Sequence, residues 1–248
     1  MMFFSRSGQI FAALLVILAI VVNIQAKSEA LPEFGHYSDV KEKKNAFFNY
    51  LLPLVLEGNQ SIIEQREQLQ ELVDNADNLS FFQQRTLTRL AERYRIKDDD
   101  LDNSEIIETL LIRVAPVPPS LVLAQAAIES AWGTSRFARE GNNLFGQWCY
   151  KKGCGMVPLQ RSAGTKHEVA RFDSAAEAVA AYMRNLNTHS AYKTLRLRRA
   201  ELTESKTENP NGHQLAETLL YYSELREVYV EEVQAVIRIN QLHQYDKL

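Results

Sequence analysis

One carboxylate, Glu129, lies in an apolar stretch of the sequence where a charge is costly. Residues 120–133 read SLVLAQAAIESAWG, and the preceding proline and the final glycine predict a helix of about twelve residues. A helix that is apolar on nearly every side is typical of a protein core. Burial raises the pKa of a carboxyl group toward neutrality, which suits a general acid. The structural alternative for Glu129 is an internal ion pair with Arg136 or Arg171.

Gln125 and Trp132 share a face with Glu129 on this predicted helix, because they stand four residues before it and three residues after it. We expect Gln125 to contact a substrate. Trp132 has two interpretations: it forms an apolar wall beside the acid and contacts the substrate, or it packs in the core.

A further pattern follows the helix. A short helix between Thr134 and Gly141 is predicted from a Ser/Thr start and a glycine stop, and residues 142–148 then read NNLFGQW. The pieces E-S-x-W-G and N-L-F-G, at this spacing within residues 121–148, resemble the signature of the peptidoglycan endo-β-N-acetylglucosaminidase domain, the flagellar-muramidase-like glucosaminidase family. The resemblance covers about residues 116–240.

The resemblance implies a fold and an activity. The fold is mainly α, a lysozyme-like helical domain with a small β-lobe, and the activity is cleavage of the glycan strands of peptidoglycan. The family places its catalytic acid on the glutamate of E-S-x-W-G, which is Glu129 here. It also implies a second acid on the lobe, at a spacing comparable with Glu168, and an active-site tyrosine that matches Tyr192. The 2-acetamido group of the substrate is the alternative to a second acid.

Residues 147–172 have the composition of the β-lobe, and three carboxylates in or near them are candidates for the second acid. Glu177 completes a predicted capping box at the start of the next helix, and Asp173 lies beside it, so helix capping accounts for both. Glu168 has no such structural role in the sequence and is the preferred candidate. Its alternative is an exposed strand carboxylate that faces a neighbouring basic residue.

Four other residues are candidates for contacts with a sugar. Asn143 belongs to the N-L-F-G piece, Phe145 is favoured as a core residue, and Trp148 either stacks on a sugar face or packs in the core. The Tyr192 hydroxyl suits the orientation of an acetamido group or a water through one hydrogen bond. The alternative is a tyrosine that only caps a helix turn.

Cys149 and Cys154 enclose a short loop with glycines at positions 153 and 155. In an exported protein this spacing predicts a disulfide that fixes the tip of the lobe. A zinc site is the rival, but it lacks a second pair of ligands. We expect no metal and no cofactor.

The first 26 residues are predicted to be a signal peptide, because residues 10–22 form an unbroken apolar run that is shorter than a membrane span. The alternative is an uncleaved anchor in the membrane. Either interpretation predicts an exported protein of the periplasm or cell envelope.

The net charge of −3 hides a strong segregation of charge. Residues 116–200 carry a net charge of +7, whereas residues 27–115 carry −6 and residues 201–248 carry −5. The basic segment predicts an anionic partner such as a cell-wall polymer. Nucleic acid is disfavoured, because there is no basic tract and no known nucleic-acid motif. The alternative is that the charges cancel across internal contacts.

The rest of the chain reads mostly as helix, and a proline-rich stretch at residues 115–119 is the best internal boundary. The sequence therefore predicts three parts: a signal peptide (1–26), an N-terminal helical region (27–115) and the enzyme domain (116–248). Further helices are predicted from Asp39 to about Leu54 with a step near Pro53, and at 61–72, 80–94, 104–114, 174–192 and within 192–248.

The sequence therefore predicts an exported glycoside hydrolase that acts on the β-1,4 N-acetylglucosaminyl bonds of peptidoglycan through Glu129. A lytic transglycosylase is the close alternative. A glycan-binding module without activity and a purely structural helical protein are alternatives of other classes.

Overall fold

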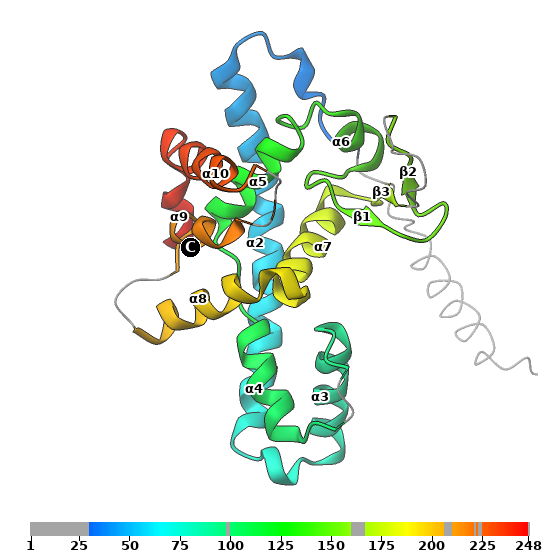
Figure 1. Cartoon of the computed structure of the whole chain (residues 1–248), viewed down its shortest axis with the longest axis vertical. Helices are drawn as coiled ribbons and strands as arrows, with labels where there is room; N and C mark the ends of the chain where they lie inside the picture. The colour runs from blue at the N-terminus through cyan, green and yellow to red at the C-terminus, as the bar shows by residue number, and fades with distance from the viewer. Residues whose placement is uncertain are drawn as a thin grey trace, which may run out of the picture.

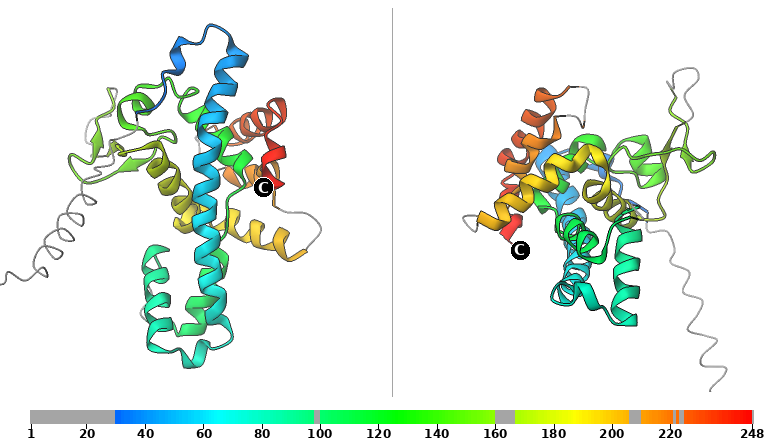
Figure 2. Two further views of the ribbon diagram at one scale, coloured as in Figure 1. Left: turned by 180° about the vertical axis from the view of Figure 1, so that it is seen from behind. Right: turned by 60° about the horizontal axis from the view of Figure 1, so that its bottom comes forward.

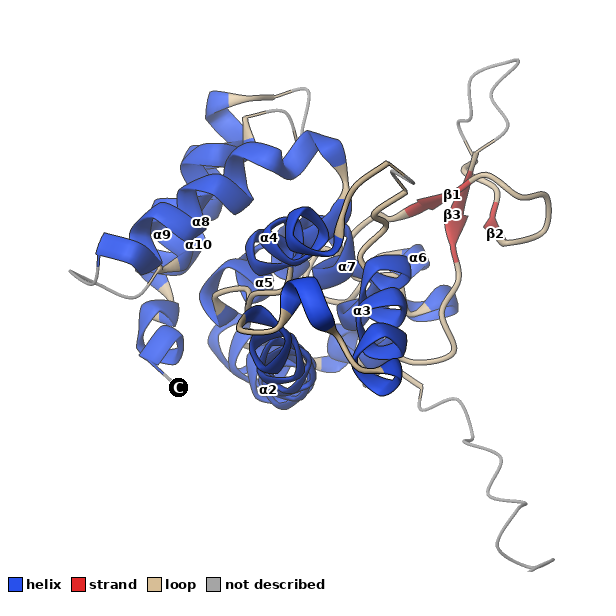
Figure 3. Cartoon of the chain, turned by 90° about the horizontal axis from the view of Figure 1, so that it is seen from below, coloured by secondary structure: helices blue, strands red, loops and turns tan. Residues whose placement is uncertain are grey.

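The computed structural model describes residues 30–97, 100–159, 167–205, 210–220, 222 and 225–247, so the predicted signal peptide lies outside them. Within these ranges the chain is mainly helical with one small three-stranded sheet, which confirms the predicted fold class (Figures 1 and 3). Each helix of the described residues is too short or too polar to cross a lipid bilayer.

The helices and strands have the following bounds: α2 Val40–Val73, α3 Phe81–Arg93, α4 Asn103–Arg113, α5 Pro119–Glu129, α6 Arg136–Gly141, β1 Trp148–Cys149, β2 Gly155–Met156, β3 Glu168–Ala170, α7 Ala175–Thr188, α8 Lys193–Ser205, α9 Gly212–Ala216 and α10 Glu227–Ile239. Short 3₁₀ turns lie at Phe34–His36, Ala76–Asn78, Ser190–Tyr192, Glu217–Leu219 and Leu242–Lys247.

Helix α2 runs along the long axis of the molecule (Figure 2) and corrects the prediction of two separate helices. Its 34 residues include Pro53, which removes one backbone hydrogen bond but does not end the helix. One part of α2 packs on α5 and α7 and another on α3 and α4. Packing on both sides of the proline stabilises a continuous helix that local propensity disfavours.

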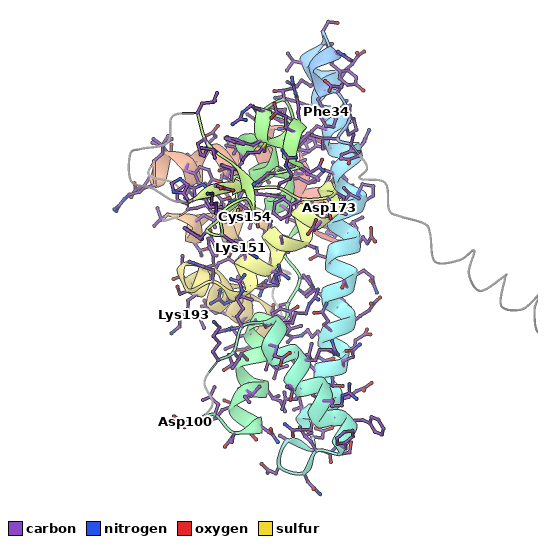
Figure 4. The ribbon with its side chains drawn as sticks, turned by 90° about the vertical axis from the view of Figure 1, so that its right-hand side faces the viewer. Phe34, Asp100, Lys151, Cys154, Asp173 and Lys193 are labelled. Carbon is purple, nitrogen blue, oxygen red and sulfur yellow. A yellow bond between two sulfur atoms is a disulfide. The ribbon has the colours of Figure 1, made fainter. Side chains whose placement is uncertain are left out.

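Helices α3 and α4 pack on α2 and on each other and form an arm at one end of the molecule. Figure 4 places Asp100, which lies between α3 and α4, far from Cys154 in the lobe. The predicted start of the 104–114 helix at Ser104 is wrong. Asp102 caps α4 by accepting a hydrogen bond from the amide of Glu105, and the Glu105 side chain completes a capping box.

Helix α5 lies at the centre of the structure and contacts α2, α9, α10 and the C-terminal 3₁₀ turn. Its residues from Pro119 to Ala127 are buried, which confirms the predicted buried helix. Asp246 binds its N-terminus, because the Asp246 carboxylate accepts hydrogen bonds from the amide and hydroxyl of Ser120 at 2.9 and 2.6 Å. A carboxylate at this end also complements the helix dipole.

Two cations of the basic segment are inside the protein. Arg199 is 3% exposed and donates hydrogen bonds to the carbonyl oxygens of Ile112, Ala115 and Pro116. Burial lowers the pKa of Arg199 to about 9. Arg196 is also buried and bonds to backbone carbonyls. Both side chains therefore stabilise bends in the chain and do not add to a basic surface.

The described residues form two ion pairs, Arg136–Glu140 and Arg198–Glu201, and both join residues three or four positions apart on one helix. The opposite charges of the three segments are therefore not cancelled by long-range ion pairs within the described ranges. Arg196 and Arg199 are buried, so these two basic residues of 116–200 do not face a partner.

The C-terminal helices α8, α9 and α10 lie on the opposite side of α2 from the sheet (Figures 1 and 2). Tyr229 and Val233 of α10 are buried whereas Val228 is 60% exposed, so α10 turns the face that carries Tyr229 toward the protein. The division into a helical region and an enzyme domain stays a prediction, and α2 packs on α5 and α7 across it.

Candidate active site

Glu129 is the last residue of α5, and a left-handed turn follows it. Ala131, Trp132 and Gly133 all have positive φ, at 50°, 59° and 75°. A side chain on Gly133 would approach a ring carbon of Phe34 to 2.4 Å, so this turn requires glycine twice over, for its conformation and for space. The Ser130 hydroxyl secures the turn by donating to the Ala126 carbonyl and accepting from the Gly133 amide. Glu129 is thereby fixed at the end of a rigid helix.

Three buried polar side chains form a chain of hydrogen bonds that ends on Glu129. The Tyr182 hydroxyl donates to Oε1 of Gln125, and Nε2 of Gln125 donates to the Tyr229 hydroxyl at 2.9 Å. The Tyr229 hydroxyl in turn donates to Oε1 of Glu129, also at 2.9 Å. Oε1 thus serves as an acceptor, so a proton held by the carboxyl group resides on Oε2.

Oε2 of Glu129 faces the loop that contains the N-L-F-G piece. A Cβ atom on Gly146 would lie 3.6 Å from Oε2, so the glycine backbone approaches the carboxyl group directly. Gly146 has a φ of +62°, which also favours glycine. Because Gly146 has no side chain, it leaves the space beside Oε2 of Glu129 open.

Burial raises the pKa of the Glu129 carboxyl above its usual range. The hydrogen bond from Tyr229 opposes this shift, and the negative charge of Glu232 adds to it. Among the described residues Glu129 has no basic partner, and Arg136 pairs with Glu140 at 3.5 Å. The alternative of an internal ion pair for Glu129 is therefore not what the structure shows. A carboxyl group with a raised pKa and one engaged oxygen is suited to donate a proton.

Three tyrosines surround the acid. Tyr222 stacks on Tyr229 with ring centroids 5.2 Å apart, and Tyr192 lies 6.1 Å from Tyr222. Burial and the charge of Glu129 raise the pKa of Tyr192 to about 12, so its hydroxyl stays protonated. Within the part of the chain that the structure describes, this hydroxyl makes no hydrogen bond, which leaves it available to a ligand. The structure thus brings Tyr192, Gln125 and Glu129 into one region.

The residues of the N-L-F-G piece build the loop. Asn143 is buried, and its amide donates to the carbonyls of Gln147 and Ala170 at 2.9 and 2.8 Å, while its oxygen accepts from the Gln147 amide. Phe145 is 2% exposed and stacks on Tyr182, which confirms its prediction as a core residue. These contacts position the backbone of Gly146 against the acid.

The two tryptophans have different surroundings. Trp132 packs edge-on against Phe47 and Phe48 of α2, and the Lys44 ammonium group lies 4.7 Å from its ring, so it joins the catalytic turn to α2. Trp148 on β1 is 56% exposed. One face of its indole stacks on the His167 ring, with centroids 4.1 Å apart, so only the other face is suited to stack on a sugar ring.

The sheet has the order β1-β3-β2, and both pairs are antiparallel. Cys149 and Cys154 form the predicted disulfide across the loop that joins β1 to β2. Because both sulfurs are in the disulfide, neither is available as a zinc thiolate, although a carboxylate oxygen of Glu168 lies within 4.8 Å of them.

Glu168 has a structural role that the sequence did not reveal. It is 7% exposed, and its carboxylate oxygens accept hydrogen bonds from the amides of Gly153 and Gly155 at 3.0 and 2.9 Å. A Cβ on Gly155 would lie 2.0 Å from the Val169 carbonyl oxygen, so the loop must pass close to β3. The expectation that Glu168 has no structural contact is therefore wrong, since its carboxylate holds the disulfide loop.

Asp173 and Glu177 have the capping role that was predicted. The amide of Glu177 donates to the Ser174 hydroxyl at 3.1 Å, and the Glu177 carboxylate accepts from the Asp173 amide at 2.8 Å. The carboxylate thus binds the residue before the cap, one position earlier than in a standard capping box.

A family of known proteins shares the part of the chain that contains Glu129, the tyrosines and the loop. Residues 109–242 match the model of a family described as mannosyl-glycoprotein endo-β-N-acetylglucosaminidase. The chain belongs to this glucosaminidase family. The family match begins near the end of α4 and ends after α10, so it contains Glu129, Tyr229 and the lobe.

The glucosaminidase is also similar to individual proteins. It is 36% identical over 183 residues to the protein Bax of Escherichia coli K12, and this alignment covers 74% of the chain and 65% of Bax. The chain thus spans less than two thirds of the length of that relative. The catalytic domain of the autolysin Auto from Listeria monocytogenes aligns with a TM-score of 0.46 and 18% identity, over 99% of this chain and 100% of that domain.

The sequence did not reveal Tyr182, Tyr222 and Tyr229 as parts of the candidate site. One signal was available. A buried glutamine needs hydrogen-bond partners for both its donor and its acceptor atoms. A tyrosine can supply such a partner inside a core, because its ring is apolar and its hydroxyl group both donates and accepts. Gln125 therefore pointed to unidentified hydroxyl groups, but nothing in the sequence identified them.

Tyr229→Phe is expected to shift the pH dependence of the glucosaminidase. The hydrogen bond from Tyr229 lowers the pKa of Glu129, so its loss raises that pKa further. A general acid is active while protonated, so the alkaline limb of the kcat/KM profile should move to higher pH. Tyr37→Phe, at an exposed tyrosine, is the control. An unchanged alkaline limb in Tyr229→Phe would show that Tyr229 does not tune the acid.

Proposed function

We propose that the protein is an exported peptidoglycan hydrolase, an endo-β-N-acetylglucosaminidase in which Glu129 is the general acid. The observation that carries the proposal is the Glu129 carboxyl group itself. It is largely buried, its pKa is raised, one oxygen accepts from Tyr229, and the other faces Gly146. The family relationship, the E-S-x-W-G and N-L-F-G pieces and the basic character of residues 116–200 support a glycan of the anionic cell wall as substrate.

In the proposed reaction the proton on Oε2 of Glu129 passes to the glycosidic oxygen as the bond from this oxygen to C1 of the N-acetylglucosaminyl residue breaks. Positive charge then develops at C1. Water adds to C1 and loses a proton, which restores the acid, so the products carry a free reducing end. Tyr229 orients the carboxyl group, and the unbonded hydroxyl of Tyr192 is placed to orient the acetamido group.

The second catalytic group is the open point of the mechanism. The contacts of Glu168 with the disulfide loop favour the acetamido group of the substrate as the partner of Glu129. The role of Glu168 as a second acid, which the family resemblance implies, stays a prediction. Substrate contacts by Gln125, Trp132, Asn143, Phe145 and Trp148 are predictions as well, and in the structure Asn143 and Phe145 act through the loop.

Glu168→Ala is expected to lower activity by about tenfold, because the loop amides lose their acceptor and the lobe loosens. Added azide should not restore the activity, since a small anion replaces a missing nucleophile and not a missing loop contact. The measurement is the release of soluble glycan fragments from peptidoglycan with and without azide, with mass spectrometry to detect fragments that carry azide at C1. Restoration by azide would contradict the loop-holding role and identify Glu168 as the second acid.

Digestion of purified sacculi tests the proposed function directly. The expected products are muropeptides with N-acetylglucosamine at the reducing end, identified by mass spectrometry after borohydride reduction. Products with a 1,6-anhydro ring would establish a lytic transglycosylase instead. Binding to sacculi without any released fragment would establish a glycan-binding module.

A further inference from the structure

A cavity lies at the other end of α5 from Glu129. It has a volume of about 670 Å³ and lies between α2, α4, the proline-rich turn and α8. In Figure 1, α8 crosses beside α2 and next to α4. Pro119, at the start of α5, lines the cavity, whereas Glu129 ends this helix, so about 15 Å of helix separates the two sites. None of the residues around Glu129 lines it.

Most of the cavity wall is aliphatic. Ile63 from α2 and Leu111 and Ile112 from α4 contribute to it, together with the prolines of the turn. Ile63 and Ile112 are 37% and 36% exposed, so large apolar side chains meet solvent here. Burial of this wall by an apolar ligand would be favourable at about 25 cal/mol per Å².

Arg66 adds a cation with free donors. Its Nη1 donates to the carbonyl oxygens of Leu111 and Val114 at 2.6 and 2.7 Å. Its Nε and Nη2 make no hydrogen bond with any described residue, and within the described ranges it has no carboxylate partner. Burial lowers the pKa of Arg66, which indicates incomplete solvation of its charge.

The other charged groups of the wall are engaged or peripheral. Arg199 is buried, and its Nη1 and Nη2 donate to carbonyls of Ile112 and the proline-rich turn and to Asn187. The Asp246 carboxylate accepts from Ser120 and from the amide of Gly212. Glu204 is exposed at the edge of the cavity. The donors of Arg66 are therefore the open polar groups that face an aliphatic wall.

We propose that this cavity binds an anionic amphiphile, with one carboxylate or phosphate head on Arg66 and an aliphatic tail along Ile63, Leu111 and Ile112. The volume lies within the range of roughly 300–1,000 Å³ that is typical of small-molecule sites. A free inorganic anion would leave the apolar wall in water, and a neutral sugar would leave the guanidinium donors without an anion. The site is independent of the proposed hydrolase activity.

Calorimetry with the full chain tests the proposal, with probes kept below their critical micelle concentrations. Dodecanoate and dodecyl phosphate should bind, while dodecanol and inorganic phosphate should bind at least about tenfold more weakly. Arg66→Gln removes the charge but retains an amide donor for the carbonyls. Ile63→Glu places a carboxylate on an exposed position of the wall. Both substitutions should weaken binding of dodecanoate at least about tenfold.

Val73→Glu is the matched control, since Val73 is an exposed aliphatic residue of the same helix that does not line the cavity. Its affinity for dodecanoate should stay within about twofold of the unchanged chain. Binding by another apolar part of the chain would survive both cavity substitutions. The proposal is overturned if dodecanoate does not bind, if dodecanol binds equally well, or if Ile63→Glu leaves the affinity unchanged. The result for Ile63→Glu can be interpreted even if Arg66→Gln is unstable, because a substitution at the exposed Ile63 should leave the fold intact.

Discussion

Glu129→Gln is expected to lower the rate of glycan cleavage by about 10³-fold, within the range of general acid catalysis. Glutamine has the shape of glutamate and keeps an oxygen that accepts from Tyr229, so the chain of hydrogen bonds persists. It has no acidic proton to place on the glycosidic oxygen. The loss should therefore fall on kcat, while binding to sacculi is retained.

The measurement is the initial rate of reducing-end release from sacculi, with circular dichroism as the check of folding. Glu140→Gln is the matched control, because Glu140 lies in the next helix and is exposed on the surface in an ion pair with Arg136. This control should keep its activity within about twofold, since surface ion pairs contribute little. Activity of Glu129→Gln within tenfold of the unchanged protein would remove Glu129 from the role of general acid.

Arg199→Met is expected to lower the free energy of unfolding by about 3 kcal/mol. Methionine retains much of the volume, but the carbonyl oxygens of Ile112, Ala115 and Pro116 lose their donor inside the protein. For a chain of this size the loss corresponds to a fall in Tm of roughly 6–12 °C. The arginine joins α8 to the proline-rich turn, so the destabilisation should be cooperative.

Arg198→Met provides the comparison at the adjacent position. The Arg198 side chain is 41% exposed and pairs with Glu201 on the surface, so its loss should change the free energy of unfolding by less than about 0.5 kcal/mol. Thermal unfolding followed by circular dichroism measures both variants. Equal Tm values for the two variants would mean that the buried hydrogen bonds of Arg199 do not hold the turn.

The catalytic helix was predictable because its signal is local. A mostly apolar sequence between a proline and a glycine predicts a buried helix without knowledge of its neighbours, and Glu129 is the single charged residue in it. Pro53 shows the opposite case. The residue predicts a break by local rules, yet packing on both sides keeps α2 continuous. That packing depends on helices far away in the sequence.

The partners of the acid could not be predicted for the same reason. Tyr229 is 100 residues from Glu129, and the register of α10 decides whether Tyr229 or Val228 faces inward. The apolar pattern of the segment fits either face. Glu168 illustrates a different limit, because its role depends on two backbone amides of a loop, and a loop conformation leaves no periodic pattern in a sequence.

Both ends of the catalytic helix are secured from the C-terminal part of the chain, by Asp246 at Ser120 and by Tyr229 at Glu129. During synthesis, a ribosome finishes the E-S-x-W-G motif long before it reaches either residue. The proposed general acid is therefore held in place only after the chain has been made through α10 and as far as Asp246. A product truncated ahead of α10, by an early stop or by a protease, would carry the whole motif but lack both contacts that secure its helix.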